Sequence, residues 1–240
     1  MKKLFFIALL SLINTYVNAE EIYIAVASNF TATSKAIIEE FEKTTGHKVK
    51  LSFGSTGKFY AQIINGAPFQ IFLAADDKHP QKLAQNGYGV PETLFTYATG
   101  KLVLWSLKEN PEQQFKKLTF RKLAIANPET APYGTAAVEA LKAMKLWEQV
   151  ESKIVKGDNI SQTQQFVSTG NAEIGFIALA QAMQEGYFWE IPQELYSPLH
   201  QQAILLKKGA QNTAAKAFLD FLKTPTAIAL ITKAGYSLEP

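Results

Sequence analysis

Apolar residues follow two different periods along the chain, and the two periods succeed each other in a regular order. A continuous apolar run at Glu21–Ala27 predicts a strand buried on both faces of a parallel sheet. Helical spacing follows at Thr31–Thr45, and alternation at Val49, Leu51 and Phe53 predicts a second strand. Strand, helix and strand in this order are typical of a βαβ unit with a right-handed crossover.

Predicted strands and helices continue to the end of the chain. Strands are predicted at Pro68–Ala75, Leu123–Ala126, Lys153–Lys156, Ile174–Ala178 and Ala203–Lys207, and the chain then ends in helices at Asn212–Leu222 and Pro225–Lys233. A long extended run at Leu94–Trp105 is interrupted by Gly100, which suits a connection between two lobes. We expect Ala203–Lys207 to return beside Leu102–Trp105.

These elements predict an α/β fold with a ligand cleft between two βαβ-type lobes. The last two helices should pack back on the first lobe, which makes that lobe discontinuous. We therefore expect lobe 1 to comprise residues 20–96 and 207–240, and lobe 2 to comprise residues 97–206.

Length and composition agree with this organisation. The chain has 240 residues, of which 47% are hydrophobic and 19% are charged, enough for two modest lobes and without a disordered signature. A basic start, a short apolar run and the final Val17-Asn18-Ala19 predict a secretory signal peptide over residues 1–19. Without Lys2 and Lys3 the formal charge falls from +3 to +1, which argues against nucleic acid as a partner. The absence of cysteine excludes disulfides, thiolate metal sites and a cysteine nucleophile.

Candidate chemistry lies where strands run into helices. The segment Gly54-Ser-Thr-Gly57 can turn tightly and direct unpaired N–H groups outward at the positive end of a helix. Strands that end at the same edge of a sheet bring Ser28 and Ser55 together. Four such turns, two in each lobe, offer Ser28 with Asn29, Ser55 with Thr56, Tyr133 with Gly134, and Ile160 with Ser161.

All four turns supply hydrogen-bond donors without charge. A dianion enclosed between them would accept backbone N–H and hydroxyl hydrogen bonds without needing an ion pair. Because a protonated oxygen would place its hydrogen against another donor, such a site favours a fully deprotonated tetrahedral anion and rejects phosphate at neutral pH. In the second lobe we interpret Asn127–Thr135 as a loop that opens a helix over Ala136–Lys145.

Five groups of residues occur in the order and spacing of periplasmic molybdate-binding proteins of ABC transporters. They are Ala27–Asn29, Gly54–Gly57, Gly66–Pro68 with Phe72–Asp76, Asn127–Glu129 with Pro132–Gly134, and Gly175–Ala178. The chain resembles that family from about Glu21 to Tyr236. The resemblance implies a two-lobed, type II periplasmic binding protein that captures molybdate or tungstate and delivers it to an inner-membrane ABC permease. It also implies a periplasmic monomer with no catalytic activity and no cofactor.

The resemblance assigns candidate roles to individual residues. Ser28 and Ser55 match the two oxyanion-binding serines of the family, each of which offers a hydroxyl and an N–H. Tyr133 and Ile160 fall where the family uses main-chain N–H groups from the second lobe. Asn29 matches a branch of the family that adds a contact there.

Two positions depart from the family pattern. Some members have a ligand-binding tyrosine where this chain has Ala178, so that donor is missing or is replaced, with Tyr133 as one candidate. After the Gly66–Pro68 segment, members of the family commonly have an acidic residue at the position where this chain has Gln70. Both departures leave open which of molybdate, tungstate or a related anion is preferred.

Two alternatives compete with this interpretation. Sulfate has the same charge and shape but is smaller, so the sequence does not distinguish a sulfate-binding protein. An exported enzyme acting on a phosphoester would need a general base or a metal near Ser55. His47, His79 and His200 lack metal-ligand spacing, and Asp76 is interpreted as a turn or cap residue, so no catalytic residue and no metal site are predicted.

Overall fold

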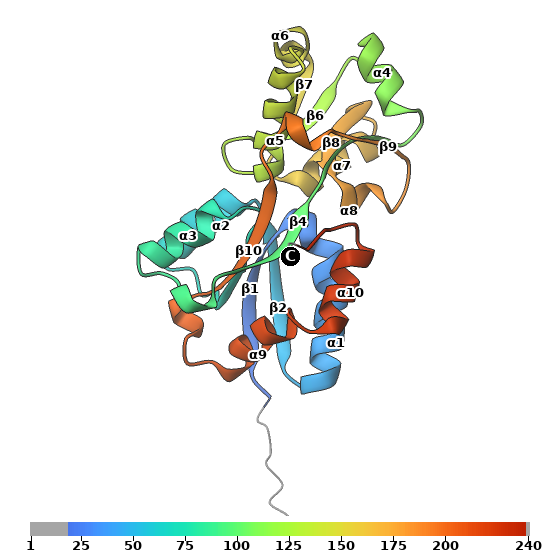
Figure 1. Cartoon of the computed structure of the whole chain (residues 1–240). Coiled ribbons are helices and arrows are strands. Elements are labelled where there is room, and N and C mark those ends of the chain that lie inside the picture. The colour runs from blue at the N-terminus through green and yellow to red at the C-terminus, as the bar shows by residue number, and fades with distance from the viewer. Residues whose placement is uncertain (1–18, 239–240) are drawn as a thin grey trace, which may run out of the picture.

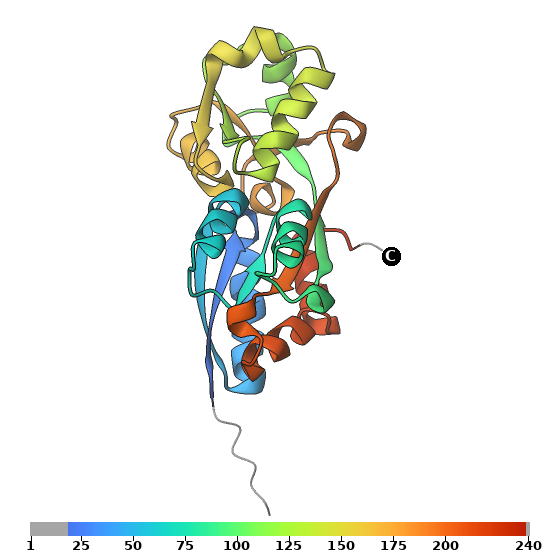
Figure 2. The ribbon, with the colours of Figure 1, turned by 90° about the vertical axis from the view of Figure 1, so that its left-hand side faces the viewer.

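The computed structural model describes residues 19–238, so the predicted signal peptide, apart from Ala19, lies outside the described residues. Figure 1 shows two lobes stacked along the long axis of the molecule, with β4 and β10 running between them. Figure 2, turned by 90°, shows the same two bodies. Each lobe contains one five-stranded sheet, so the two-lobed α/β fold predicted from the sequence is confirmed.

The first sheet, in lobe 1, has the strand order β2-β1-β3-β10-β4. Its strands are β1 (Glu21–Ala27), β2 (Lys48–Gly54), β3 (Ile71–Leu73), β4 (Phe95–Gly100) and β10 (Leu199–Leu205). The helices of this lobe are α1 (Thr31–Thr45), α2 (Thr56–Ile64), α3 (Lys78–Gln85), α9 (Thr213–Phe221) and α10 (Pro225–Lys233). Strands β1, β2 and β3 are parallel, and β10 is antiparallel to both β3 and β4.

Both faces of the first sheet are covered, as the unbroken apolar run of β1 predicts. Ile24 packs in one cluster with Ile37 and residues of α9 and α10, whereas the adjacent Ala25 packs in another cluster with Phe59 of α2. Successive side chains of a strand point to opposite faces, so one strand serves two cores. Figure 1 shows α1 and α10 on one side of the sheet and α2 and α3 on the other, and residues of α9 pack in the same cluster as those of α1.

The second sheet, in lobe 2, has the order β7-β6-β8-β5-β9. Its strands are β5 (Leu102–Ser106), β6 (Leu123–Ala126), β7 (Ile154–Gly157), β8 (Ile174–Ala178) and β9 (Tyr187–Glu190). The helices are α4 (Pro111–Lys117), α5 (Pro132–Ala143), α6 (Trp147–Val150), α7 (Ile160–Ser168) and α8 (Leu179–Ala182). Short 3-10 helices lie at Ser28–Phe30, Pro91–Thr93, Glu151–Lys153, Gln193–Leu195 and Lys207–Gly209.

One predicted strand pairing is wrong. The strand β10 does not lie beside Leu102–Trp105 but pairs with β3 and β4, as in the pair Ala203 and Leu73. The neighbours of β5 are β8 and β9. Apolar periodicity identifies a buried strand but not the strand that pairs with it, because several apolar strands are equally suitable partners.

The chain passes between the lobes twice. The extended run at Leu94–Trp105 is divided at Lys101 into β4 of the first sheet and β5 of the second, as expected for a connection. The strand order also puts β4 and β10 in the first sheet, whereas the predicted division gave residues 97–206 to lobe 2. We propose lobe boundaries that follow the sheets, at Lys101 and near Ser197.

The longest helix in the described range 19–238 is α1, with 15 residues. None of the helices there combines the length and the apolar character that crossing a membrane requires.

Candidate functional site

A small cavity lies between the lobes, at the ends of strands from both sheets. Its lining comprises Ala27, Ser28, Asn29, Gly54, Ser55, Thr56 and Ala75 from lobe 1, and Ala131, Pro132, Tyr133 and Ile160 from lobe 2. The lining therefore includes all five predicted site residues, and it includes no charged side chain. Residues separated by more than 100 positions in the chain meet here because the ends of parallel strands face the cleft.

Strand register brings Ser28 and Ser55 to the same edge. The strands β1 and β2 pair in parallel up to Ala27 and Gly54, so each serine is the first residue beyond a paired strand end. Ser28 begins the 3-10 helix that leads into α1, and Ser55 is the N-cap of α2. Each serine therefore stands at the positive end of a helical segment.

The hydroxyl of Ser55 is not used by the helix that it precedes. A serine at the N-cap ordinarily accepts a hydrogen bond from the second or third N–H of its helix, but Ser55 makes no such bond. Ser55 is only 3% exposed, and its Oγ has no hydrogen-bond partner among the described residues. Buried polar atoms are nearly always hydrogen-bonded, so this hydroxyl is available to a ligand in the cavity.

Lobe 2 contributes the first turns of two helices. Helix α5 begins at Pro132, four residues before the predicted start, because proline is well tolerated at the first helical position. Tyr133 is therefore the second residue of α5, and Ile160 is the first residue of α7. N–H groups in a first turn have no carbonyl partner within their own helix, so both can donate into the cavity.

Close approach of the chain at the start of α5 requires a glycine. A Cβ at Gly134 would lie 2.2 Å from the carbonyl oxygen of Ala126, at the end of β6. The third residue of α5 can therefore carry no side chain, and the first turn of the helix packs directly on the strand end.

The polar ends of the Asn29 and Tyr133 side chains are hydrogen-bonded to residues that do not line the cavity. Asn29 Nδ2 donates to Gln201 Oε1 at 2.8 Å and to Tyr236 Oη at 3.2 Å. Tyr133 Oη accepts from Gln201 Nε2 at 3.3 Å. The Tyr133 hydroxyl thus lies beside Gln201, which does not line the cavity, and Ala178 is not among the lining residues either.

The sequence analysis did not identify Gln201. The one available signal was a pair of glutamines, Gln201 and Gln202, directly before the apolar residues of β10. In the turn that offers Ser55 with Thr56, Thr56 Oγ1 accepts from the N–H of Ala75 at 3.0 Å, which ties the start of α2 to the segment that follows β3.

Direct hydrogen bonds join the lobes around the cavity. The N–H of Gly57 donates to the carbonyl oxygen of Thr130 at 2.8 Å, and Ser161 Oγ donates to the carbonyl oxygen of Ser28 at 3.2 Å. Farther out, the charged ends of Lys58 on α2 and Asp158 before α7 lie 2.8 Å apart. These contacts hold the two lobes closed over the cavity.

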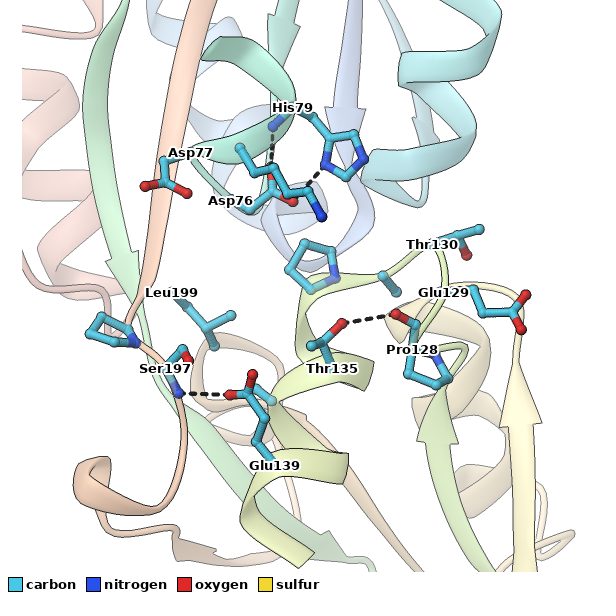
Figure 3. A pocket seen from close by; sticks show the side chains of 15 residues that line it. Asp76, Asp77, His79, Pro128, Glu129, Thr130, Thr135, Glu139, Ser197 and Leu199 are labelled. Atoms are coloured by element: carbon cyan, nitrogen blue, oxygen red, sulfur yellow. Dashed lines mark hydrogen bonds and ion pairs between the residues drawn. The ribbon is translucent and has the colours of Figure 1, made fainter. Parts of the chain in front are cut away.

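A larger cleft lies beside the cavity, and Figure 3 shows its side chains. Asp76 and His79 line it from lobe 1, with Asp76 Oδ2 and His79 Nδ1 2.7 Å apart, and Asp77 lies nearby. Glu129 and Glu139 line it from lobe 2. Lys78 also lines this cleft, but four carboxylates outnumber it and create a negative potential that disfavours an anion, so the small uncharged cavity is the better candidate for an oxyanion.

Buried tyrosine hydroxyls lie beside Gln201 and Asn29. Burial raises the pKa of the Tyr133 hydroxyl well above its usual range, and it does the same for Tyr97 and raises the pKa of Tyr236. These hydroxyls therefore remain neutral at physiological pH. In the described part of the chain no cluster of three His, Cys, Asp or Glu side chains could hold a metal ion.

The family model for bacterial extracellular solute-binding proteins matches residues 22–237. The chain belongs to this family. This solute-binding protein is 51% identical over 230 residues to the molybdate-binding protein ModA of Azotobacter vinelandii, covering 92% of this chain and 91% of that protein. It is 47% identical over 226 residues to ModA of Rhodobacter capsulatus, covering 92% and 90% of the two chains. The resemblance found in the sequence is thus confirmed.

Solved structures agree with the fold. The periplasmic molybdate-binding protein of Azotobacter vinelandii superposes with a TM-score of 0.87 at 39% identity, covering 91% of this solute-binding protein and all of that chain. The sulfate-binding protein SubI of Mycobacterium tuberculosis reaches a TM-score of 0.74 at 12% identity, covering 90% and 86% of the two chains. At so low an identity, SubI shares the fold alone. The type II periplasmic binding protein architecture expected from the resemblance is confirmed.

Proposed function

We propose that this protein captures molybdate, and tungstate in the same way, as the solute-binding component of an ABC importer. The observation that carries this proposal is a cavity between the lobes that is lined, among residues 19–238, by uncharged groups, and in which the buried hydroxyl of Ser55 lacks a partner within that range. Two relatives at 51% and 47% identity are named molybdate-binding proteins, which supports the choice of ion.

In this proposal the ion is held by seven uncharged donors. Ser28 and Ser55 each contribute a hydroxyl and an N–H, whereas Asn29, Tyr133 and Ile160 contribute N–H groups alone. The side-chain amide of Asn29 is already engaged by Gln201 and Tyr236, so its backbone is the available donor.

The energetics permit tight binding. Hydrogen bonds to a charged group contribute about 1.5 to 3 kcal/mol each, so seven supply about 10 to 20 kcal/mol. Association costs about 4 to 15 kcal/mol, and the difference is compatible with sub-micromolar affinity.

The donor set also explains selectivity. Molybdate and tungstate present four oxygens without a proton at neutral pH, and each oxygen can accept. Phosphate at neutral pH keeps a proton that would meet a donor, which costs an unsatisfied buried group.

The remaining parts of the proposal follow from the family. The protein acts in the periplasm as a monomer, presents the closed lobes to an inner-membrane permease, and catalyses no reaction. Its curated relatives named above are binding proteins.

Isothermal titration of the purified protein with molybdate, tungstate, sulfate and phosphate tests the proposal. We expect sub-micromolar affinity for molybdate and tungstate, weaker binding of sulfate, and no binding of phosphate. The double variant Ser28→Ala with Ser55→Ala should lose affinity by orders of magnitude. Sulfate binding as tight as that of molybdate would overturn the choice of ion, and an unchanged affinity in the double variant would overturn the site.

A further inference from the structure

Gln201 is a polar residue in a fully buried position. It lies on β10, the strand that returns from lobe 2 to lobe 1, and it is 0% exposed. The pairing of β10 with β4 shifts register between Gln201 and Gln202, which marks a bulge at this point. Bulges re-aim side chains, and a buried amide is costly unless its groups are hydrogen-bonded.

The amide of Gln201 joins residues from both lobes. Its Oε1 accepts from Asn29 Nδ2 at 2.8 Å and from Tyr97 Oη at 3.2 Å, both in lobe 1. Its Nε2 donates to Tyr133 Oη at 3.3 Å, in lobe 2. Asn29 and Tyr133 both line the oxyanion cavity, whereas Gln201 does not. From a position outside the cavity, the Gln201 side chain therefore connects two cavity residues that belong to different lobes.

The Tyr133 hydroxyl occupies a niche between the two connecting strands. A Cβ at Gly100, on β4, would lie 2.0 Å from Tyr133 Oη and 2.7 Å from Gln201 Nε2. Only glycine leaves room for the hydroxyl here. Tyr133 lines the cavity, whereas its hydroxyl lies beside Gly100 and Gln201, which do not line it. The ring of Tyr133 therefore extends from the cavity to the strands that connect the lobes.

We propose that Gln201 is a positioning residue of the oxyanion site, which fixes Asn29 and Tyr133 relative to each other across the two lobes. The hydroxyl of Tyr133 serves this contact, while its N–H serves the ion. Because the ring is anchored at Gly100 and Gln201, the first turn of α5 is held where its N–H groups converge with those of lobe 1. The inference rests on the proposed function and adds a residue that does not touch the ion.

Two tyrosine variants test the inference as a matched pair. Tyr133→Phe and Tyr97→Phe each remove one hydroxyl from the same amide, but Tyr97 belongs to the same lobe as Gln201, and its hydroxyl is shared with the carbonyl oxygen of Ala74 at 3.0 Å. We expect Tyr133→Phe to weaken molybdate binding about three- to tenfold, the range of one neutral buried hydrogen bond, mainly through faster dissociation. Tyr97→Phe should stay within about twofold of the natural protein, although both variants lower the thermal midpoint of the unliganded protein.

A double-mutant comparison separates positioning from a general loss of stability. In a Gln201→Met background, Tyr133→Phe should have no further effect on molybdate affinity, because the contact is already absent. If Gln201→Met does not fold, the comparison of the two tyrosine variants decides alone.

Other outcomes would overturn the inference. Equal losses of affinity in the two tyrosine variants would indicate a structural role only, and an unchanged affinity in Tyr133→Phe would exclude positioning. A loss above a hundredfold in Tyr133→Phe would mean that the hydroxyl contacts the ion. Failure of the natural protein to bind molybdate would refute the proposed function instead, so the two failures are distinguishable.

Discussion

Replacement of Ser55 by alanine should separate ligand binding from stability. Ser55 is the N-cap of α2, and a serine N-cap usually contributes about 1 kcal/mol to stability through its bond to the helix. That bond is missing here, and the buried Oγ has no partner in the described range 19–238. Ser55→Ala therefore removes a donor available to the ion and no side-chain hydrogen bond within the described residues.

The expected magnitudes follow from the contacts. Loss of one hydrogen bond to a charged ligand costs about 1.5 to 3 kcal/mol, which corresponds to a molybdate affinity about 10- to 150-fold weaker. The thermal midpoint of the unliganded protein should stay the same or rise slightly, because an unsatisfied polar group has been removed.

The chain offers a matched control in Asn212→Ala. Asn212 is the N-cap of α9, and its side chain accepts from the N–H of Ala215 at 2.8 Å. This variant should lose about 1 kcal/mol of stability, a shift of about 2 to 4 °C, with unchanged affinity.

Isothermal titration with molybdate and scanning calorimetry without ligand measure the two quantities. The reasoning is refuted if Ser55→Ala binds molybdate within twofold of the natural protein. It is refuted equally if the unliganded midpoint of Ser55→Ala falls as far as that of Asn212→Ala.

Three further predictions concern the closure of the lobes and the buried hydroxyls. The exposed ion pair of Lys58 and Asp158 should contribute less than about 1 kcal/mol to lobe closure. Lys58→Ala should therefore weaken molybdate binding less than about fivefold at low salt and should have no effect at 1 M salt. A hundredfold loss would indicate that the Lys58 ammonium contacts molybdate directly. Gly100→Ala places a Cβ against the Tyr133 hydroxyl and should weaken molybdate binding by about tenfold or more, but by less in a Tyr133→Phe background. If titration calorimetry showed that the losses of the two substitutions simply add, Gly100 would not be making room for the hydroxyl. Burial raises the pKa of Tyr97 and Tyr133, so above pH 10 the unfolded chain loses protons that the folded chain keeps, and the free energy of unfolding should fall as pH rises. In denaturant titrations, Tyr133→Phe should make the free energy of unfolding fall less steeply with pH, and an unchanged pH dependence would count against a contribution from Tyr133.

Much of the fold follows from the sequence because it depends on neighbouring residues. The apolar run at Glu21–Ala27 and the helix spacing of Thr31–Thr45 give elements with the same bounds in the structure. The two tail helices are confirmed as well, within a residue or two at each end. Periodicity, capping and turn chemistry act over a few positions, so they are visible in the chain itself.

Other elements were missed because their local patterns are weak. The helix α4 covers only seven residues, and β9 is an edge strand with exposed side chains such as Tyr187 and Phe188. An edge strand with one neighbour lacks the buried, alternating pattern by which strands are recognised.

The turns that carry the donors could be found from the sequence, since each is a strand end followed by a helix start, as at Ser28 and Ser55. Only the tertiary structure decided which side chains are free for a ligand. Whether the Ser55 hydroxyl is unpaired, and whether the Tyr133 hydroxyl turns to Gln201, depends on groups that lie far away in the chain. Tyr133 and Gln201 are 68 positions apart, and Asn29 and Gln201 are 172 apart. No local propensity encodes such pairings, because they arise when two sheets and their connecting strands pack together.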